Sequence, residues 1–242
     1  MTHYQEEKIS SLAQIRNEQR LLESLEQLCQ SLGFEYYAYG VRLPLPVSQP
    51  RILTLNNYSP EWNRHYRERG YLEVDPTIRH GLHSSMPIVW SDRVFARTTE
   101  LWSDARAAGL RVGWAQACRD SRGNTGLLTL ARGAEPLTRC ELRSKQPRLV
   151  WLTQSTHAAM ARVLLPRMAP ELEVQLSPRE TEVMRWAAAG KTAGETAEIL
   201  GISERTACFH IGNALNKLNC TNKTAAAVKA VSLGLLDPGQ AD

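Results

Sequence analysis

The sequence predicts two domains of different class, an α+β domain followed by an all-α domain of four helices. Segments with strand-like and helix-like apolar spacing alternate over the first part of the chain, whereas the last part shows helical spacing alone. The composition changes as well, since all seven tyrosines and five of the six tryptophans precede residue 152. A chain of 242 residues, 43% of them apolar, suffices for two buried cores. We expect the α+β domain over residues 1–169, a linker over 170–175 and the helical domain over 176–242.

The strands of the first domain are predicted from aromatic and β-branched runs between turn residues. A helix should precede them and end at Gly33, because leucines recur at helical spacing: Leu21, Leu22, Leu25, Leu28 and Leu32. Strands are expected over 34–43, 51–56 and, at a sheet edge, 87–90. Two more, over 110–118 and 125–132, flank the turn sequence DSRGN and predict a hairpin.

The helices of this domain are predicted from caps and glycine stops. They run from Ser59-Pro60 to Gly70, from Asp75-Pro76 onward, over 98–108, and from Thr138 onward. Pro147 is expected to kink the last of them. Strands covered by helices in this order describe an α+β fold, with a central sheet between helical layers. Two prolines between Leu165 and Pro170 then interrupt the apolar pattern, which predicts the linker.

Residues 192–218 have the pattern of a helix-turn-helix. Thr192 and Glu195 form a capping box, in which each side chain satisfies a backbone N–H at a helix start. Gly201 supplies a left-handed stop, and Ser203 caps a second helix running to Leu218. Such a pair most often places its second helix in a DNA major groove, although periodicity alone also fits a pair packed against another domain.

Two further helices complete the domain. The sequence LSPRE at 176–180 is a second capping box, with proline at the first helical position and a helix expected to run to Ala189. A last helix is expected from Asn222 to Gly234. The helix-turn-helix is therefore the middle pair of four helices.

The second helix of the motif has two faces. Its apolar stripe consists of Ala207, Ile211, Ala214, Leu215 and Leu218. The opposite face carries Arg205, Phe209, Gly212, Asn213 and Asn216, with Cys208 at the border. A phenylalanine away from the apolar stripe, beside a glycine that permits close approach, predicts contact with a group such as a thymine methyl.

The distribution of charged residues also indicates that this face of the second helix binds DNA. Residues 176–242 balance seven basic against seven acidic side chains, although the whole chain has a net charge of +4. Residues 205–236 contain no acid but include Arg205, Lys217, Lys223 and Lys229. This local excess predicts phosphate contacts, although an ordinary solvated surface shows the same pattern.

Aromatic residues are the notable feature of the first domain. Tyr58, Trp62 and Tyr66 recur at intervals of four, which predicts that their rings project from one side of a helix. Asp75 and Trp90 add a hydrogen-bond acceptor and a donor. An apolar cavity with a few polar groups is what a small-molecule pocket needs. The same pattern is typical of a core, and Asp75 before a proline is also a good helix cap.

The helical domain resembles the DNA-binding domain of LuxR-type transcription regulators. The resemblance rests on LSPRETEVMRWAAAGKT, ETAEILGISERT, FHIGNALNKL and NKTAAAVKA. Cys208 and Gly212 stand where that family often has basic residues that read bases. The candidate DNA contacts are Lys191, Thr192, Ser203, Arg205, Thr206, Cys208, Phe209, Gly212, Asn213, Asn216 and Lys217.

The first domain resembles the autoinducer-binding domain of the same regulators, on YSPEWNRHYRERGYLEVDPTIRHGL, PIVW and AAGLRVGW. In that family the pocket holds an N-acyl-homoserine lactone. The resemblance implies that Trp62 donates to the lactone carbonyl and that Asp75 accepts from the amide N–H. Tyr58 and Thr129 would hold the acyl carbonyl. The head group would be walled by Tyr66, Trp90, Trp102 and Leu110, and the acyl chain would lie on Ala38 and Gly40.

The two resemblances imply a ligand-responsive regulator of quorum sensing, with no catalytic residues, cofactor or metal. The ligand would complete the first domain, permit a homodimer and place two recognition helices about one helical turn apart on operator DNA. RNA polymerase is a further candidate partner. The polar start MTHYQEEK and the lack of an apolar run of 18 residues predict a soluble cytoplasmic protein with no membrane contact.

Three alternatives stay open. One keeps the fold but has a ligand other than a lactone. Another is a phosphorylated response regulator, which would need an N-terminal acidic pair that the opening residues do not show. The third is an enzyme with a site at His65, His80, His83 and Cys118, which lack metal-ligand spacing. The five cysteines show no C-x-x-C spacing and predict reduced structural thiols.

Overall fold

The computed structural model describes residues 2–46, 50–170 and 173–236. The chain divides into two compact units. The first comprises Met1–Arg42, Ile52–Asp120 and Thr125–Arg167, and the second comprises Leu43–Arg51, Ser121–Asn124 and Met168–Asp242. Glu171 and Leu172 of the predicted linker lie outside the described residues.

The first unit is built on an antiparallel sheet of five strands in the order β2-β1-β5-β4-β3. The strands are β1 (Tyr36–Arg42), β2 (Ile52–Asn56), β3 (Ile88–Val89), β4 (Val112–Arg119) and β5 (Thr125–Arg132). The predicted hairpin is confirmed, since β4 pairs with β5 from Val112 opposite Arg132 to Arg119 opposite Thr125. The predicted edge position of β3 is also confirmed.

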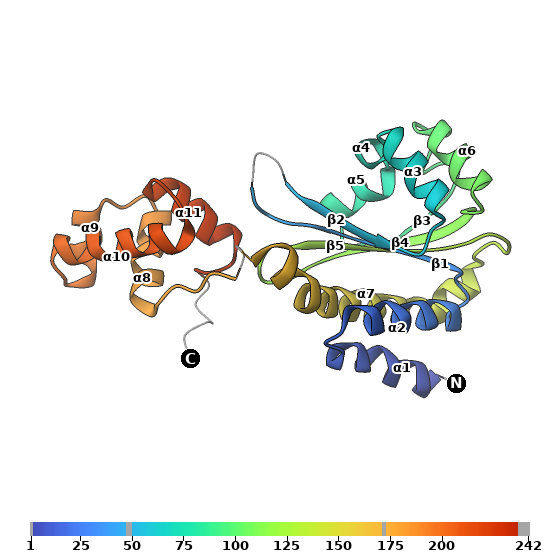
Figure 1. Ribbon diagram of the computed structural model, residues 1–242, viewed down its shortest axis with the longest axis horizontal. Coiled ribbons are helices and arrows are strands. Elements are labelled where there is room, and N and C mark those ends of the chain that lie inside the picture. Colours follow the sequence, from blue (N-terminus) through green and yellow to red (C-terminus); the bar gives the residue numbers. More distant parts are fainter. Residues whose placement is uncertain (1, 47–49, 171–172, 237–242) are drawn as a thin grey trace. The chain divides into compact units, whose positions relative to one another are not determined.

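Helices cover both faces of this sheet. The helices are α1 (Thr2–Ser11), α2 (Glu18–Ser31), α3 (Pro60–Glu68), α4 (Tyr71–Val74), α5 (Pro76–His83), α6 (Thr99–Ala107) and α7 (Arg139–Met168). In Figure 1, α3 to α6 lie on one face, and α7 and α2, with α1 beyond them, lie on the other. The predicted α+β architecture, with a sheet between helical layers, is confirmed.

Two helices were not predicted. Helix α1 offers a weak apolar pattern, because its buried positions include a glutamine, Gln5, beside Ile9. The Gln5 side-chain amide donates to the Ser31 carbonyl at 2.9 Å, which joins α1 to α2. Helix α4 is a single turn that begins after Gly70, whose φ of 64° lies in the left-handed region. A turn this short has no periodicity to read.

The prediction that two prolines interrupt the helix between Leu165 and Pro170 is wrong for the first of them, as helix α7 shows. It continues through Pro166 to Met168 and also contains Pro147. A proline in the last turn removes only one backbone hydrogen bond. Leu164 and Leu165 beside it are buried, and this burial offsets the loss.

An ion pair joins α7 to the sheet. Arg132 of β5 donates two hydrogen bonds to the Glu141 carboxylate, at 2.9 and 2.8 Å, and Lys145 donates a third at 2.6 Å. The hydrogen bonds from Arg132, followed by those from Lys145, lower the pKa of Glu141 to about 2, against the effect of burial. This carboxylate is therefore ionised and neutralised in the folded chain.

The second unit contains the four predicted helices. They are α8 (Pro178–Ala188), α9 (Ala193–Leu200), α10 (Glu204–Leu218) and α11 (Lys223–Ser232). Both predicted capping boxes are present, Ser177 with Glu180 and Thr192 with Glu195. Gly201 ends α9 in the left-handed conformation, with φ of 63°. The helix-turn-helix prediction is confirmed.

Candidate functional site

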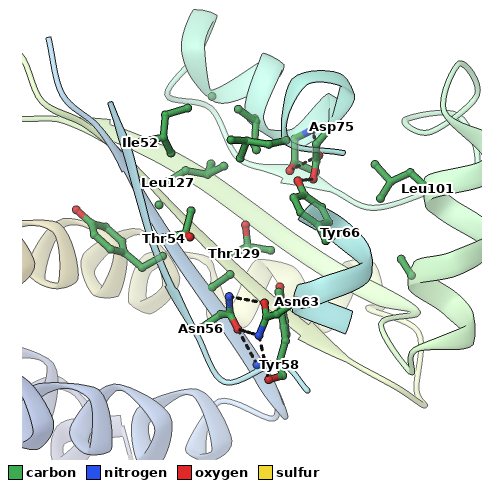
Figure 2. A pocket seen from close by; sticks show the side chains of 18 of the residues that line it. Ile52, Thr54, Asn56, Tyr58, Asn63, Tyr66, Asp75, Leu101, Leu127 and Thr129 are labelled. Atoms are coloured by element: carbon green, nitrogen blue, oxygen red, sulfur yellow. Dashed lines mark hydrogen bonds between the residues drawn. The ribbon is translucent and has the colours of Figure 1, made fainter. Parts of the chain in front are cut away.

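The first unit encloses a cavity of about 740 Å³ between the sheet and helices α3 to α6. Nine of the ten predicted ligand-binding residues line it: Ala38, Gly40, Tyr58, Trp62, Tyr66, Asp75, Trp90, Leu110 and Thr129. Figure 2 shows the side chains of Tyr66 and Thr129 directed into it from the helical layer and from the sheet. The structure thus brings these residues together, while their contact with a ligand stays a prediction.

The cavity arises because small residues lie on one face of β1. Alternation along the strand places Tyr39 on the opposite face, where its hydroxyl oxygen is 2.7 Å from Nδ1 of His157 on α7. Ala38 and Gly40 lie on the cavity face, and pairing places Thr129 of β5 beside Ala38. The sheet therefore presents large side chains to α7 and little volume to α3 and α5.

Asp75 caps α5 and lines the cavity at the same time. Its Oδ1 accepts hydrogen bonds from the backbone N–H and the hydroxyl of Thr77, at 2.8 and 2.6 Å. Its Oδ2 accepts from the Tyr66 hydroxyl at 2.9 Å (Figure 2). Burial raises the pKa of Asp75, and these hydrogen bonds only partly oppose the effect. The backbone N–H of Ile78 also acts on this carboxylate, which has about four lone-pair sites, so a ligand N–H would share an oxygen with these groups or replace the Tyr66 hydroxyl.

Several donors on the cavity wall lack an acceptor within the described part of the chain. They are the indole N–H of Trp62 and the hydroxyls of Tyr58 and Thr129. The indole N–H of Trp90 is buried and has no partner among these residues either. Burial, and then the charge of Asp75, raises the pKa of Tyr58, which keeps its hydroxyl protonated. An unpaired donor in a dry site costs about 1–3 kcal/mol, so carbonyl oxygens are favourable occupants.

The prediction that Tyr58, Trp62 and Tyr66 share one helix is wrong for Tyr58, which lies before the start of α3. Ser59, with ψ of 147°, is the N-cap of α3, so Tyr58 belongs to the extended segment after β2. The backbone N–H of Tyr58 donates to Asn56 Oδ1 at 3.0 Å. The amides of Asn56 and Asn63 bond reciprocally, at 3.0 and 2.9 Å (Figure 2). This pair of amides fixes the position of Tyr58, and no sequence motif predicted it.

Trp102 is the predicted residue that the structure does not bring to the cavity. Its ring stacks on Phe95, with centroids 4.7 Å apart and an interplanar angle of 7°. Its indole N–H donates to Asp92 Oδ1 at 2.6 Å. Phe95 lines the cavity in its place. Which of the two rings faces the cavity depends on how α6 packs, and no local pattern reports that.

Strand pairing brings further residues to the wall that the sequence did not single out, among them Arg42, Ile52, Thr54, Thr125 and Leu127. Alternation alone would have placed Arg42 on the face of Ala38 and Gly40. The residues of β2 and β5 could not be added, because their register against β1 is a tertiary property.

The predicted DNA-contacting face of α10 is open to solvent. Phe209 is 63% exposed, and Arg205 and Asn216 are exposed as well. A Cβ added at Gly212 would meet no atom within 4 Å. Packing within the chain therefore requires neither an aromatic ring at 209 nor a glycine at 212, which leaves both available to a partner.

Several other candidate DNA contacts already hold intramolecular bonds. Lys217 Nζ is 2.7 Å from Oε2 of Glu180, a buried carboxylate of α8. Lys191 Nζ is 3.3 Å from Glu195 Oε1. The hydroxyls of Thr192 and Ser203 accept the N–H groups that they cap, and the Thr206 hydroxyl is 2.8 Å from that of Ser203.

The histidines and cysteine of the enzyme alternative are dispersed. His65 bonds to Asp104 at 2.6 Å, and Asp104 also accepts from the Tyr71 hydroxyl at 2.6 Å. His80 bonds to the Met86 carbonyl, and Cys118 is buried. Among the described residues, no three His, Cys, Asp or Glu side chains are placed to hold a metal ion. None of the described helices is long and apolar enough to cross a membrane.

Comparisons with known proteins match both units. Residues 17–160 match the autoinducer binding domain, and residues 174–230 match the luxR family of bacterial regulatory proteins. The transcriptional activator AnoR of Acinetobacter nosocomialis is 41% identical, over 98% of this chain and 100% of its own. The transcriptional activator SolR of Ralstonia nicotianae is 44% identical, over 91% and 94%.

Solved structures agree. A crystal structure of Escherichia coli SdiA superposes with a TM-score of 0.84, at 31% identity over 97% of this chain and 98% of that one. A second SdiA structure, in complex with octanoyl-rac-glycerol, superposes with a TM-score of 0.83, at 30% identity over 97% and 96%.

Proposed function

Because this chain belongs to the LuxR family of quorum-sensing transcription regulators, we propose that its cavity binds an N-acyl-homoserine lactone and that the protein then binds operator DNA as a homodimer. The family consists of regulators with an autoinducer-binding domain and a helix-turn-helix domain, not of enzymes. The proposal assigns residues 1–169 to the autoinducer, 176–242 to DNA and 170–175 to a linker. It places the protein in the cytoplasm, with RNA polymerase as a further partner.

One observation carries the lactone proposal, the match between the polar groups of the cavity and those of the ligand. An acyl-homoserine lactone brings two carbonyl groups and one amide N–H into the site. Among the described residues, the wall offers the unpaired donors of Trp62, Tyr58 and Thr129, and it offers the carboxylate of Asp75 beside the Tyr66 hydroxyl. We assign Trp62 to the lactone carbonyl, Tyr58 and Thr129 to the acyl carbonyl, and Asp75 to the amide N–H.

The remaining lining residues supply apolar contact. Tyr66, Trp90 and Leu110 would enclose the lactone ring, while Ala38 and Gly40 would lie beneath the acyl chain. Trp102 would act through Phe95, on which it stacks. Each buried methylene of the tail contributes about 0.8 kcal/mol.

For the second unit, we propose that α10 enters the major groove. Arg205, Phe209, Gly212, Asn213 and Asn216 would face the bases, with Cys208 at the border. The DNA phosphates would be contacted by the exposed parts of five further side chains: Lys191, Thr192, Ser203, Thr206 and Lys217. Two copies would place two such helices about one turn of DNA apart.

Thermal unfolding of the full chain tests the ligand. An acyl-homoserine lactone at 100 times its Kd should stabilise the protein by about 2.7 kcal/mol, a rise in Tm of about 5 to 10 °C. The ring-opened acyl-homoserine, which differs only in its hydrolysed lactone, is the matched control and should stabilise much less. Equal stabilisation by both, or by neither at any chain length, would refute the lactone assignment. Gel shift with and without ligand, and light scattering for the oligomeric state, test the DNA step.

A second candidate is an acylated ligand other than a lactone. It is favoured by the SdiA structure that contains octanoyl-rac-glycerol, a molecule with a medium acyl chain and no lactone ring. The same thermal experiment with 1-octanoyl-rac-glycerol separates the two. Stronger stabilisation by the glycerol ester than by the octanoyl lactone would favour this candidate.

A further inference from the structure

The floor of the cavity consists of three successive rows of residues across β2, β1 and β5. Row one is Asn56, Ala38 and Thr129; row two is Thr54, Gly40 and Leu127; row three is Ile52, Arg42 and Thr125. All nine residues line the cavity. Neighbouring rows are two residues apart along each strand, or about 6.7 Å, so rows one and three are about 13 Å apart.

The head-group end of this floor is closed. Beyond row one, Tyr36 and Ala131 form the next pair of β1 and β5, and both belong to the aromatic cluster around Trp62 and Phe95. A ligand whose acyl carbonyl lies at Thr129 can therefore extend its tail along the floor toward row three.

The middle of the floor is wide because of Gly40. A Cβ built at this position meets its nearest atoms, in Leu53 and Thr54, at 3.9 Å, so the backbone accepts a side chain here without strain. Packing therefore does not require a glycine at position 40 of this strand. The absence of a side chain there leaves room in the cavity above row two. At Gly126, on the other face of β5, an added Cβ would instead lie 2.3 Å from His157.

The far end of the floor is polar. Arg42 lines the cavity at row three, and within the described part of the chain its guanidinium has no hydrogen-bond or ion-pair partner. Thr125 lies opposite it on β5. The adjacent wall is held by Arg119 of β4, which donates to the carbonyl of Leu82 at 2.9 Å. An apolar tail that reaches row three meets a guanidinium and a hydroxyl beside the side chain of Ile52.

We propose that the distance from Thr129 to Arg42 selects acyl chains of about ten to twelve carbons. The acyl chain would lie in a track over the three rows, from Thr129 to Arg42. Gly40 would leave room for the chain in the middle of this track, and Arg42 would set its end. This inference rests on the proposed binding of acylated ligands in the cavity. An extended hydrocarbon chain advances about 1.25 Å per carbon, from a bond of about 1.5 Å at the tetrahedral angle. The span of about 13 Å between rows one and three therefore takes about ten carbons beyond the carbonyl.

The test is a series of Kd values for acyl-homoserine lactones with acyl chains of four to sixteen carbons. Each Kd is measured from the tryptophan fluorescence of the full chain. In the wild type, the Kd should fall about fourfold for each added carbon, because each one buries a further methylene. The fall should stop at ten to twelve carbons. Arg42→Leu should carry the fall on to about fourteen carbons. Arg64→Leu removes an exposed arginine of α3 that does not line the cavity, and it should leave the wild-type series unchanged.

Gly40→Val is an independent variant at row two. A β-branched side chain suits a strand, and it should block the track about 6.7 Å from the carbonyl. Binding of the four-carbon lactone should persist, while the gain with length should stop at about six carbons.

The outcomes separate this inference from the function on which it rests. If no lactone of any length binds, both are overturned. If lactones bind but the wild-type optimum is shorter than eight carbons, or Arg42→Leu and Gly40→Val leave it unchanged, the length assignment alone is overturned.

Discussion

Asp75 in the first unit and Glu180 in the second are both carboxylates at the start of a helix, yet their surroundings differ. Glu180 accepts from the Ser177 backbone N–H at 2.8 Å and from Lys217 at 2.7 Å. Burial opposes its ionisation, but the bonds from Lys217 and Ser177 prevail and lower its pKa. Within the described part of the chain, Asp75 accepts from hydroxyl and backbone groups and pairs with no cation, and burial raises its pKa.

The difference distinguishes a carboxylate that completes a fold from one that awaits a partner. The second unit neutralises its buried charge with its own lysine. The first unit leaves a buried carboxylate and several donors facing one cavity. Four tests follow from this contrast, in order of decreasing effect.

Asp75→Asn should weaken lactone binding about 100-fold, or about 3 kcal/mol. Asparagine can keep the helix cap through its oxygen, but its NH₂ group then faces the ligand N–H or the Tyr66 hydroxyl. Fluorescence titration measures the Kd. Glu61→Gln, at an exposed carboxylate of α3 that does not line the cavity, is the control. An unchanged Kd in Asp75→Asn would remove the distinction between the two units.

Glu180→Ala should destabilise the second unit by about 2 kcal/mol, because the Ser177 N–H loses its acceptor and Lys217 loses its partner. Hydrogen exchange of peptides from α8 and α10 reports the change, and lactone affinity should stay the same. Glu182→Ala removes a partly exposed carboxylate of α8 that pairs with Arg179, and it should cost less than about 0.5 kcal/mol. Equal effects of the two substitutions would contradict the structural role of Glu180.

Phe209→Ala should weaken operator binding about tenfold, or about 1.4 kcal/mol, and leave thermal stability unchanged, since the ring is 63% exposed. Gel shift at fixed salt, on DNA selected from a random pool by the wild type, measures it. Val74→Ala, an exposed apolar residue of the first unit, should have no effect. Loss of stability without loss of DNA binding would show that Phe209 serves the fold.

The smallest effect is a pH dependence. Because the folded pKa of Asp75 is raised, the carboxylate that accepts the amide N–H is fully present above that pKa and is lost as pH falls through it. Lactone affinity should therefore fall as the pH is lowered from neutral through that pKa. The residual binding of Asp75→Asn should show no such slope. A parallel slope in that variant would assign the titration to another group.

The caps and stops show why much of the fold was predictable. Ser177, Thr192 and Ser203 each accept a backbone N–H three residues ahead, so the pattern that signals the helix is also the contact that starts it. The β4–β5 hairpin is similarly local. Helix α1 escaped prediction because its anchor is the bond from Gln5 to Ser31, 26 residues away.

The candidate site was only partly predictable for the same reason. The resemblance supplied Asp75 and Trp62 without any geometry. Asn63, which holds Tyr58 through Asn56, carried no signal, because its role depends on where β2 ends against α3. Phe95, for which the sequence analysis predicted no role, lines the wall where Trp102 was expected.

The two domain classes, most helix ends and the helix-turn-helix could be predicted without coordinates, because they depend on residues within one turn or one hairpin of each other. The tertiary structure was needed to show that Ala38, Thr129 and Asn56 form one row, that Arg42 lines the same cavity four residues further along β1, and that Lys217 neutralises Glu180. These relations join residues from different elements, and strand register and helix packing set them through the whole core.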